Sequence, residues 1–348
     1  MDPEHRPHTL EQPRKVRRQP MVLSSETLVR AEPLEGDGHV LLVQPAIAAI
    51  DLATWARDQK EWIESRLATH GGILFRGFQI SSAGALDRVV AAVAGEPLTY
   101  RERSSPRHQV SGNVYTSTEH PPDQSIFLHN ENSYQHMWPR RVLFCCVTPA
   151  ETGGRTPIAD TRRVYQRIDS AVRQRFVDRQ VLYVRNFGEG LGLSWQVVFQ
   201  TDDRSAVEAY CRNAGIEWTW GNGNRLRTRQ VRPAAVRHPR TGEMSWFNHA
   251  TFFHVSTLDA SIRDVLLSQF SDGELPNNTY YGDGQPIEPS VLDELRGAYT
   301  DATRTFPWQT GDLLVLDNML MAHGREPYTG PRSILVGLAM PAAWADFS

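Results

Sequence analysis

The chain has 348 residues, 40% of them hydrophobic, so it can bury a sizeable core, and a single domain of this length is possible. Charged residues make up 22% and the formal net charge is -3, which gives no broad electrostatic reason to expect nucleic acid or a membrane surface as partner. No run approaches the roughly 18 apolar residues of a membrane span and the N-terminus lacks an apolar signal core, so we expect a cytoplasmic protein.

The first segment, residues 1–20, is polar, contains four prolines and carries a basic run at 14–18. Such a composition predicts a disordered tail, although an electrostatic docking arm is an alternative. Residues 21–348 are then expected to form one domain, because no linker is long enough to separate two.

The remaining elements follow in chain order. Helical apolar spacing predicts helices over 54–67 and 83–94, on either side of a short buried strand over 72–78. From about residue 110, short β-like runs alternate with Gly-, Pro- and Asn-rich connections, at 125–129, 141–147, 181–187, 313–316 and 333–338. Helical insertions are predicted at 163–175, 205–213 and 258–270. We therefore expect a mainly β fold with helical decoration, built on a double-stranded β-helix, or jelly-roll.

The cysteines do not form a disulfide framework. Cys145 and Cys146 are adjacent in the apolar run 142–147, and Cys211 stands apart. Because adjacent strand residues point to opposite faces, Cys145 and Cys146 are predicted to be buried thiols that act as small hydrophobes. This pattern indicates a reducing compartment.

The segment 127–134 contains a histidine and a glutamate two positions apart, His129 and Glu131. On a strand both side chains project from the same face, so this imidazole and this carboxylate would point at one metal ion. They supply two thirds of a 2-His-1-carboxylate facial triad, which suits Fe(II) because three positions stay open for co-substrate and O₂. A distant strand must supply the third ligand.

Near the C-terminus, a turn and a buried strand lead through Asp317 and Asn318 to a single histidine, His323, which is a plausible third ligand. Arg332 then opens another predicted strand. Its guanidinium could form a bidentate, charge-assisted pair with the far carboxylate of 2-oxoglutarate. A His-x-Glu pair alone is weak evidence, but this order of motifs along the chain is far more specific.

With these motifs the chain resembles the taurine dioxygenase-like Fe(II)/2-oxoglutarate-dependent oxygenases. Within that group it is closer to the branch of syringomycin-type aspartyl hydroxylases and clavaminate synthase-like enzymes. The resemblance runs from about residue 71 to residue 339 and is carried by segments 72–78, 115–119, 128–134, 153–160 and 317–325. It implies a jelly-roll fold, with iron at His129, Glu131 and His323. It also implies that 2-oxoglutarate binds Arg332 and Thr156, the threonine that follows a Gly-Gly pair after the acidic ligand.

Two features depart from the wider family pattern. The carboxylate is Glu131 instead of the more widespread aspartate, a choice that clavaminate synthase-like members share. The spacing from His323 to Arg332 is shorter than in taurine dioxygenase, so Arg325 is a lesser candidate for the co-substrate contact. Because related halogenases have a small residue at the carboxylate position, Glu131 also favours a hydroxylase over a halogenase.

Substrate contacts are predicted less directly. Segment 246–254 contains Trp246, Asn248 and two histidines, His249 and His254, which could line the mouth of the site or pack in the core. A glycine-rich stretch around residue 190 could form a mobile lid that contributes Arg185 or Trp195, or it could be a structural loop. No phosphate-loop lysine precedes it, so nucleotide binding has little support.

The function implied is hydroxylation of an unactivated C–H bond, with the β-carbon of an amino acid as the expected position, in natural-product biosynthesis. The substrate would be free or tethered to a peptidyl carrier protein, with the tethered form slightly favoured. Alternatives are a desaturase or cyclase of the same family, or a non-catalytic jelly-roll whose metal site is closed by a fourth protein ligand. The sequence identifies neither the substrate nor the oligomeric state.

Overall fold

The computed structural model describes residues 28–34, 40–95, 98, 102, 108–112, 114–117, 120–188 and 192–347. At its centre, two β-sheets share one apolar core. The tail expected over residues 1–20 lies outside the described residues. The larger sheet has the strand order β1 (Val29–Pro33), β2 (Val40–Pro45), β3 (Gly72–Phe75), β17 (Leu313–Asp317), β7 (Met137–Thr148), β20 (Ser333–Ala343), β5 (Val114–Thr116) and β4 (Gln109–Ser111). The smaller sheet has the order β16 (Thr303–Arg304), β9 (Ile158–Asp160), β18 (Met321–Arg325) and β6 (Ile126–His129).

Neighbouring strands of both sheets are antiparallel, except for the parallel pair β2 and β3. The core between the sheets takes side chains from both, including Phe144 and Leu316 of the larger sheet and Ile158 and Met321 of the smaller one. Two facing antiparallel sheets with peripheral helices confirm the prediction of a mainly β fold with helical decoration.

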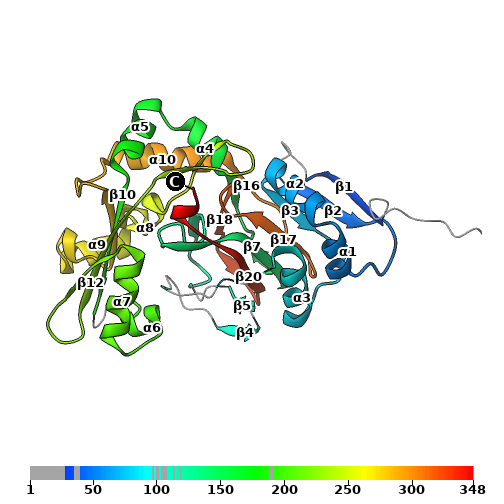
Figure 1. The fold of residues 1–348 in the computed structure, drawn as a ribbon, viewed down its shortest axis with the longest axis horizontal. Coiled ribbons are helices and arrows are strands. Elements are labelled where there is room, and N and C mark those ends of the chain that lie inside the picture. Colours follow the sequence, from blue (N-terminus) through cyan, green and yellow to red (C-terminus); the bar gives the residue numbers. More distant parts are fainter. Residues whose placement is uncertain are drawn as a thin grey trace, which may run out of the picture.

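The other face of the larger sheet is covered by three helices, α1 (Leu52–Asp58), α2 (Lys60–His70) and α3 (Ala83–Ala94), drawn in blue to cyan in Figure 1. The single helix predicted over 54–67 is in fact two, because the backbone leaves helical geometry at Gln59 (φ -112°, ψ 24°). Asp51 and Ser82 cap α1 and α3 by accepting hydrogen bonds from backbone N–H groups of the first turn.

The alternation of side chains along β7 separates the two cores. Cys145 packs in the core under the helices, whereas Cys146 packs in the core between the sheets. Both cysteines are buried, and burial raises the pKa of each thiol to about 12. The prediction of two buried thiols on opposite faces of a strand is confirmed.

A long insertion between β9 and β17 covers the outer face of the smaller sheet, on the left of Figure 1. Its four-stranded sheet has the order β11 (Glu217–Trp220), β12 (Leu226–Arg232), β10 (Val181–Phe187) and β15 (Asn277–Tyr281). Its helices are α4 (Thr161–Arg167), α5 (Ser170–Arg179), α6 (Trp195–Phe199), α7 (Arg204–Ala214), α8 (Ala250–Phe253), α9 (Ala260–Gln269) and α10 (Pro289–Ala302). The helix predicted over 163–175 is split into α4 and α5, and Asp169 caps the second of them.

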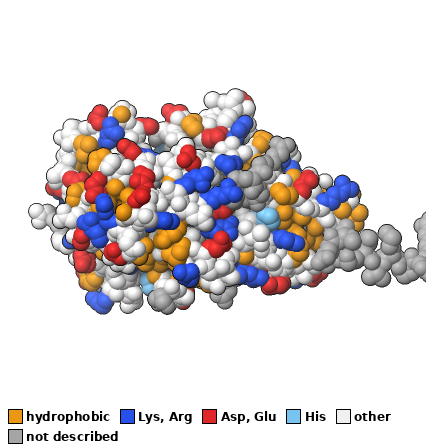
Figure 2. All heavy atoms as spheres, turned by 90° about the horizontal axis from the view of Figure 1, so that it is seen from above, with side chains coloured by type: hydrophobic (Ala, Val, Ile, Leu, Met, Phe, Trp, Pro, Cys, Tyr) orange, Lys and Arg blue, Asp and Glu red, His pale blue; other side chains and the backbone are white. Residues whose placement is uncertain are grey.

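Among the described residues, β8 (Thr152–Gly153) pairs with β19 (Tyr328–Thr329), and β13 (Ala235–Arg237) pairs with β14 (Met244–Trp246). The 3₁₀ turns include η2 (Val255–Thr257), η3 (Asp272–Glu274) and η4 (Trp344–Phe347). On the face drawn in Figure 2, basic and acidic side chains are interspersed, in keeping with the small net charge. Among the described residues, no helix has both the length and the apolar character needed to cross a membrane.

Candidate metal centre and adjoining cavity

The pairing of β6 with β18 brings two histidines face to face. His129 is the last residue of β6, and its register partner on β18 is His323. Their ring centroids lie 4.6 Å apart, although the two residues are far apart in the sequence. Antiparallel pairing places directly opposite side chains on the same face of the sheet, so both imidazoles point into the same space.

Glu131 reaches this space from the turn that follows β6, and not from the strand itself. One of its carboxylate oxygens, Oε2, lies 3.5 Å from Nε2 of His323. One ligand atom from each of His129, Glu131 and His323 can be chosen so that all three lie within 4.8 Å of one another. The spacing argument therefore found the right neighbours, but a turn and not strand alternation aims the glutamate.

Two contacts orient the ring of His129. Its Nδ1 lies 2.9 Å from the carbonyl oxygen of Phe127. Because a carbonyl can only accept a hydrogen bond, Nδ1 is the donor, and Nε2 is the ring nitrogen that would ligate a metal. The ring stacks on Phe252 at a centroid distance of 4.4 Å, which fixes its plane.

These donors fit a mononuclear Fe(II) site. Two imidazoles and one carboxylate form the facial set that this metal takes in oxygenases. Among the described residues, no other group of three or more histidine, cysteine, aspartate or glutamate side chains has this compactness, and this cluster contains no fourth such ligand. Two histidines and one carboxylate are the number and kind of protein ligands that the facial triad of Fe(II) oxygenases uses.

Behind the centre, a buried ion pair supports the strand that leads to His323. Arg141 Nη1 lies 2.6 Å from Asp317 Oδ2, and His238 Nε2 lies 3.2 Å from the same oxygen. Burial alone would raise the pKa of Asp317, but the Arg141 guanidinium and His238 together hold it well below its usual range. The carboxylate is therefore ionised and fixes the end of β17.

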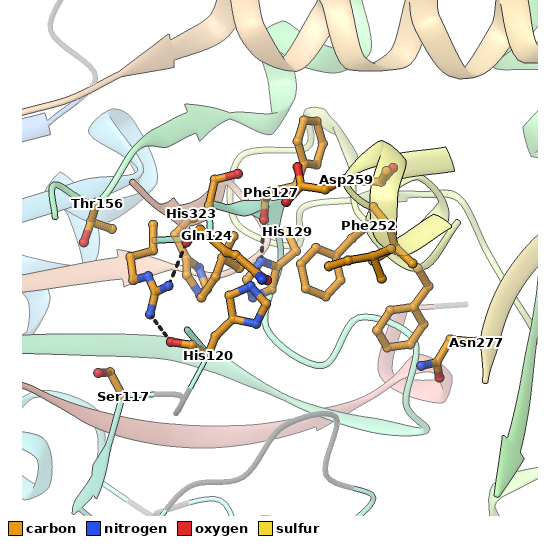
Figure 3. A pocket seen from close by; sticks show the side chains of 18 of the residues that line it. Ser117, His120, Gln124, Phe127, His129, Thr156, Phe252, Asp259, Asn277 and His323 are labelled. Atoms are coloured by element: carbon orange, nitrogen blue, oxygen red, sulfur yellow. Dashed lines mark hydrogen bonds between the residues drawn. The ribbon is translucent and has the colours of Figure 1, made fainter. Parts of the chain in front are cut away.

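A cavity of about 360 Å³ opens in front of the two histidines. In Figure 3, Thr156 and Ser117 lie on one side of His129 and His323, while Phe252 and Asn277 lie on the other. The cavity thus has two ends that meet at the candidate metal centre.

The first end contains the residues predicted to bind 2-oxoglutarate. Arg332 lines it, and its Nε donates a hydrogen bond of 3.0 Å to the carbonyl of Gly154. Burial, together with the neighbouring charge of Arg325, lowers the pKa of Arg332 to about 10, so the guanidinium is protonated at neutral pH. Thr156 also lines this end, and its hydroxyl oxygen accepts a 3.1 Å hydrogen bond from Trp308 Nε1.

Arg325, the lesser candidate for the co-substrate, is already engaged. Its two terminal nitrogens donate hydrogen bonds to the carbonyl oxygens of His120, Pro121 and Gln124. The guanidinium therefore holds the loop before β6 in place. Arg332 lies on the same cavity wall and donates only through Nε among the described residues, so it is the better placed of the two for a ligand carboxylate.

The second end of the cavity is formed by the insertion. Its wall is largely apolar, with Phe252 and Phe253 of α8 and Ile262 and Leu266 of α9. Among the described residues that line the cavity, Asp259 is the one carboxylate, and it stands at the exposed start of α9. Although Asp259 is at the N-cap position, its side chain makes no capping hydrogen bond, so the carboxylate is available to a ligand.

The four residues predicted to contact the substrate do not line this cavity. Trp195 and Trp246 are buried in two apolar cores of the insertion, and Trp195 donates a 2.9 Å hydrogen bond to Asn224. Asn248 is buried and bonds to backbone groups of Ala234 and Ala250.

Arg185 is buried as well, with Nη1 at 3.7 Å from a carboxylate oxygen of Glu102. The substrate candidates are buried because the inserted sheet packs against its helices. A local sequence pattern does not predict that packing. Part of the glycine-rich stretch, at 189–191, lies outside the described residues.

Of the two further histidines in segment 246–254, His254 lines the cavity, whereas His249 is buried beside His129. The hydroxyl oxygen of Ser133 lies 2.6 Å from Nδ1 of His249. Phe252 and Phe253, two of the aromatic residues expected to wall an apolar entrance, line the cavity, whereas sequence reasoning missed Asp259 and Asn277 at the second end. Neither Asp259 nor Asn277 carries a local sequence signal.

Comparisons with known proteins identify relatives of this chain. Residues 31–339 match the model of the taurine catabolism dioxygenase TauD, TfdA family. The chain is 41% identical to the dapdiamide synthesis protein DdaC of Enterobacter agglomerans, over 80% of this chain and 85% of that protein. It is 28% identical to a clavaminate synthase-like protein of Arabidopsis thaliana, over 84% of this chain and 89% of the relative.

Among solved structures, the fold resembles that of PvcB from Pseudomonas aeruginosa, described as an Fe, α-ketoglutarate-dependent oxygenase from an isonitrile synthetic pathway. The TM-score is 0.54 at 19% identity, with 91% of this chain and 93% of PvcB covered. It also resembles AAD-2 in complex with Mn(II) and N-oxalylglycine, with a TM-score of 0.52 at 13% identity and coverage of 89% and 96%. These likenesses confirm the predicted jelly-roll fold.

Proposed function

Because the chain belongs to the TauD/TfdA family and is therefore an Fe(II)- and 2-oxoglutarate-dependent dioxygenase, we propose that it hydroxylates an amino acid at an unactivated C–H bond, expected at the β-carbon. Family membership sets aside the alternative of a non-catalytic jelly-roll. The relationship to a dapdiamide synthesis protein supports a role in natural-product biosynthesis.

In this proposal His129, Glu131 and His323 hold the iron, and Arg332 and Thr156 bind the far carboxylate of 2-oxoglutarate. The observation that carries it is the convergence of three ligand atoms on a cavity that Arg332 and Thr156 also line. When bound, iron and 2-oxoglutarate supply an oxidant: one oxygen atom of O₂ enters the substrate C–H bond, the other enters succinate, and CO₂ is released. The protein binds both molecules, orients the C–H bond and limits access of water.

The second end of the cavity supports an amino-acid substrate. Asp259 offers a carboxylate to an ammonium group, and the phenyl rings of Phe252 and Phe253 offer apolar contact to a carbon chain. Arg325 is occupied by backbone carbonyls, and Arg332 is assigned to the co-substrate.

Those two arginines are the cationic side chains, histidines aside, among the described residues that line the cavity. We therefore favour a substrate whose own carboxylate is esterified, as in a thioester on a peptidyl carrier protein, over a free amino acid.

The test is to incubate the iron-loaded enzyme with 2-oxoglutarate, O₂ and one amino acid at a time, presented free and as its carrier thioester. Mass spectrometry should find a product that has gained one oxygen atom, formed together with an equivalent of succinate. A product that has lost two hydrogen atoms would instead identify a desaturase or cyclase. Oxidation of free amino acids alone would refute the carrier-bound substrate and leave the iron site intact.

A further inference from the structure

We infer that Asn318 is a positioning residue for the candidate metal centre, because its side chain binds both the N–H and the carbonyl of Glu131. The inference rests on the proposed function in so far as the metal occupies the His129, Glu131 and His323 site. Asn318 would contact neither metal nor substrate, and it would act by holding the backbone of Glu131 in place.

The side chain of Asn318 makes three hydrogen bonds with main-chain atoms. Its Oδ1 accepts from the N–H of Glu131 at 2.8 Å, and its Nδ2 donates to the carbonyl of Glu131, also at 2.8 Å. The same Nδ2 donates to the carbonyl of Pro139 at 2.8 Å. All of these groups are buried, so water does not compete for them and each bond has a well-defined geometry.

This side chain takes the place of a missing strand partner. The β6–β18 ladder pairs His129 with His323, and β6 ends there. Glu131, two residues farther on, lies in a turn where no strand satisfies its N–H and carbonyl. Because an amide side chain carries a donor and an acceptor side by side, asparagine can reproduce the pair of bonds that a neighbouring strand would provide.

Asn318 also connects Glu131 to the third ligand. It lies in the turn between β17 and β18, and β18 carries His323. That turn is fixed from the other direction as well, because Asn130 Nδ2 donates to the carbonyl of Asn318 at 2.7 Å and Met319 N donates to Asp317 Oδ1 at 3.0 Å. Asn318 thus ties the His-x-Glu turn to the distant histidine, and its loss should let the carboxylate move relative to both imidazoles.

Substitution by aspartate separates the two functions of the amide. In Asn318→Asp one oxygen can still accept from the N–H of Glu131. The other would face two carbonyl oxygens, of Glu131 and Pro139, and repel them. Asn318→Leu keeps a similar volume but removes all three bonds. We expect both variants to bind metal roughly 10–100-fold more weakly, the usual effect of losing a group that orients a metal ligand.

Asn186 provides a matched control. Its Nδ2 also donates to two carbonyls, those of Gly273 at 3.1 Å and Leu275 at 2.7 Å, but it lies on β10 in the inserted sheet. Asn186→Asp therefore creates the same clash away from the metal ligands. It should lower the melting temperature without changing metal affinity.

The experiment titrates metal-free protein with Mn(II), a redox-stable substitute for Fe(II), and measures the dissociation constant by the electron paramagnetic resonance of free Mn(II). Circular dichroism and melting temperatures of the metal-free variants report folding separately. The inference is supported if the Asn318 variants, but not Asn186→Asp, lose affinity at least about tenfold. Folded Asn318 variants that bind Mn(II) like the wild type would overturn it.

If the Asn318 variants do not fold, Asn130→Ala tests the inference instead, because it removes only the hydrogen bond that Asn130 donates to the Asn318 carbonyl. Weaker Mn(II) binding supports the inference, and unchanged binding contradicts it. A wild-type protein that does not bind Mn(II) would refute the proposed metal site itself, which separates the two failures.

Discussion

Substitution of Arg332 most directly tests the proposal that one end of the cavity binds 2-oxoglutarate and the other binds the substrate. In Arg332→Ala the protonated guanidinium is lost from the end of the cavity that also holds Thr156. A hydrogen bond to a charged group contributes about 1.5–3 kcal/mol, which corresponds to a roughly 10- to 150-fold weaker affinity for 2-oxoglutarate. Arg325 cannot take over, because its terminal nitrogens are bonded to the loop carbonyls of residues 120–124.

The assay is the dependence of succinate formation on 2-oxoglutarate concentration, checked by direct titration of the iron-loaded protein under nitrogen. Arg332→Lys keeps the charge but loses the planar fork, so its affinity should lie between wild type and Arg332→Ala. Arg325→Ala should mainly lower the melting temperature. If Arg325→Ala weakens 2-oxoglutarate binding more than Arg332→Ala does, the assignment of the two arginines is wrong.

Four further predictions follow from the site and its surroundings. Alanine in place of His129, Glu131 or His323 should abolish turnover and sharply weaken Fe(II) binding. The protein should stay folded; metal content and circular dichroism check the two expectations. With Glu131 present, chloride buffer should give no chlorinated product by mass spectrometry, and finding one would contradict the hydroxylase assignment. Cys145 and Cys146, whose pKa values burial raises to about 12, should resist iodoacetamide at pH 8 until the protein is denatured.

Burial, followed by the charge of Arg296, lowers the pKa of His254 from 6.5 to about 4. Between these pH values the unfolded chain binds more protons at this residue, so the free energy of unfolding should fall as the pH drops from 6.5 to 4. His254→Gln should reduce that slope in urea titrations, and an unchanged slope would contradict the attribution.

The sequence by itself determined the fold class, the candidate ligands and the arginine proposed for the co-substrate. Each of these depends on local pattern: the alternation that buries Cys145 and Cys146 on opposite faces, the two-residue spacing of His129 and Glu131, and a histidine placed after a buried strand. The cysteine pattern can be read locally because strand geometry repeats every two residues. The spacing of His129 and Glu131 brought the two residues together for another reason, because the turn after β6 aims the glutamate.

Only the tertiary structure decided which residues line the cavity. Trp246 and Asn248 have the chemistry of a binding site but are used in packing and in backbone hydrogen bonds, whereas Asp259 reaches the cavity from the start of α9. The position of α9 depends on how the insertion packs on the smaller sheet, and the role of Asn318 depends on a contact 187 residues away in the chain. Long-range packing of this kind depends on the shapes of whole elements, and no short motif records it.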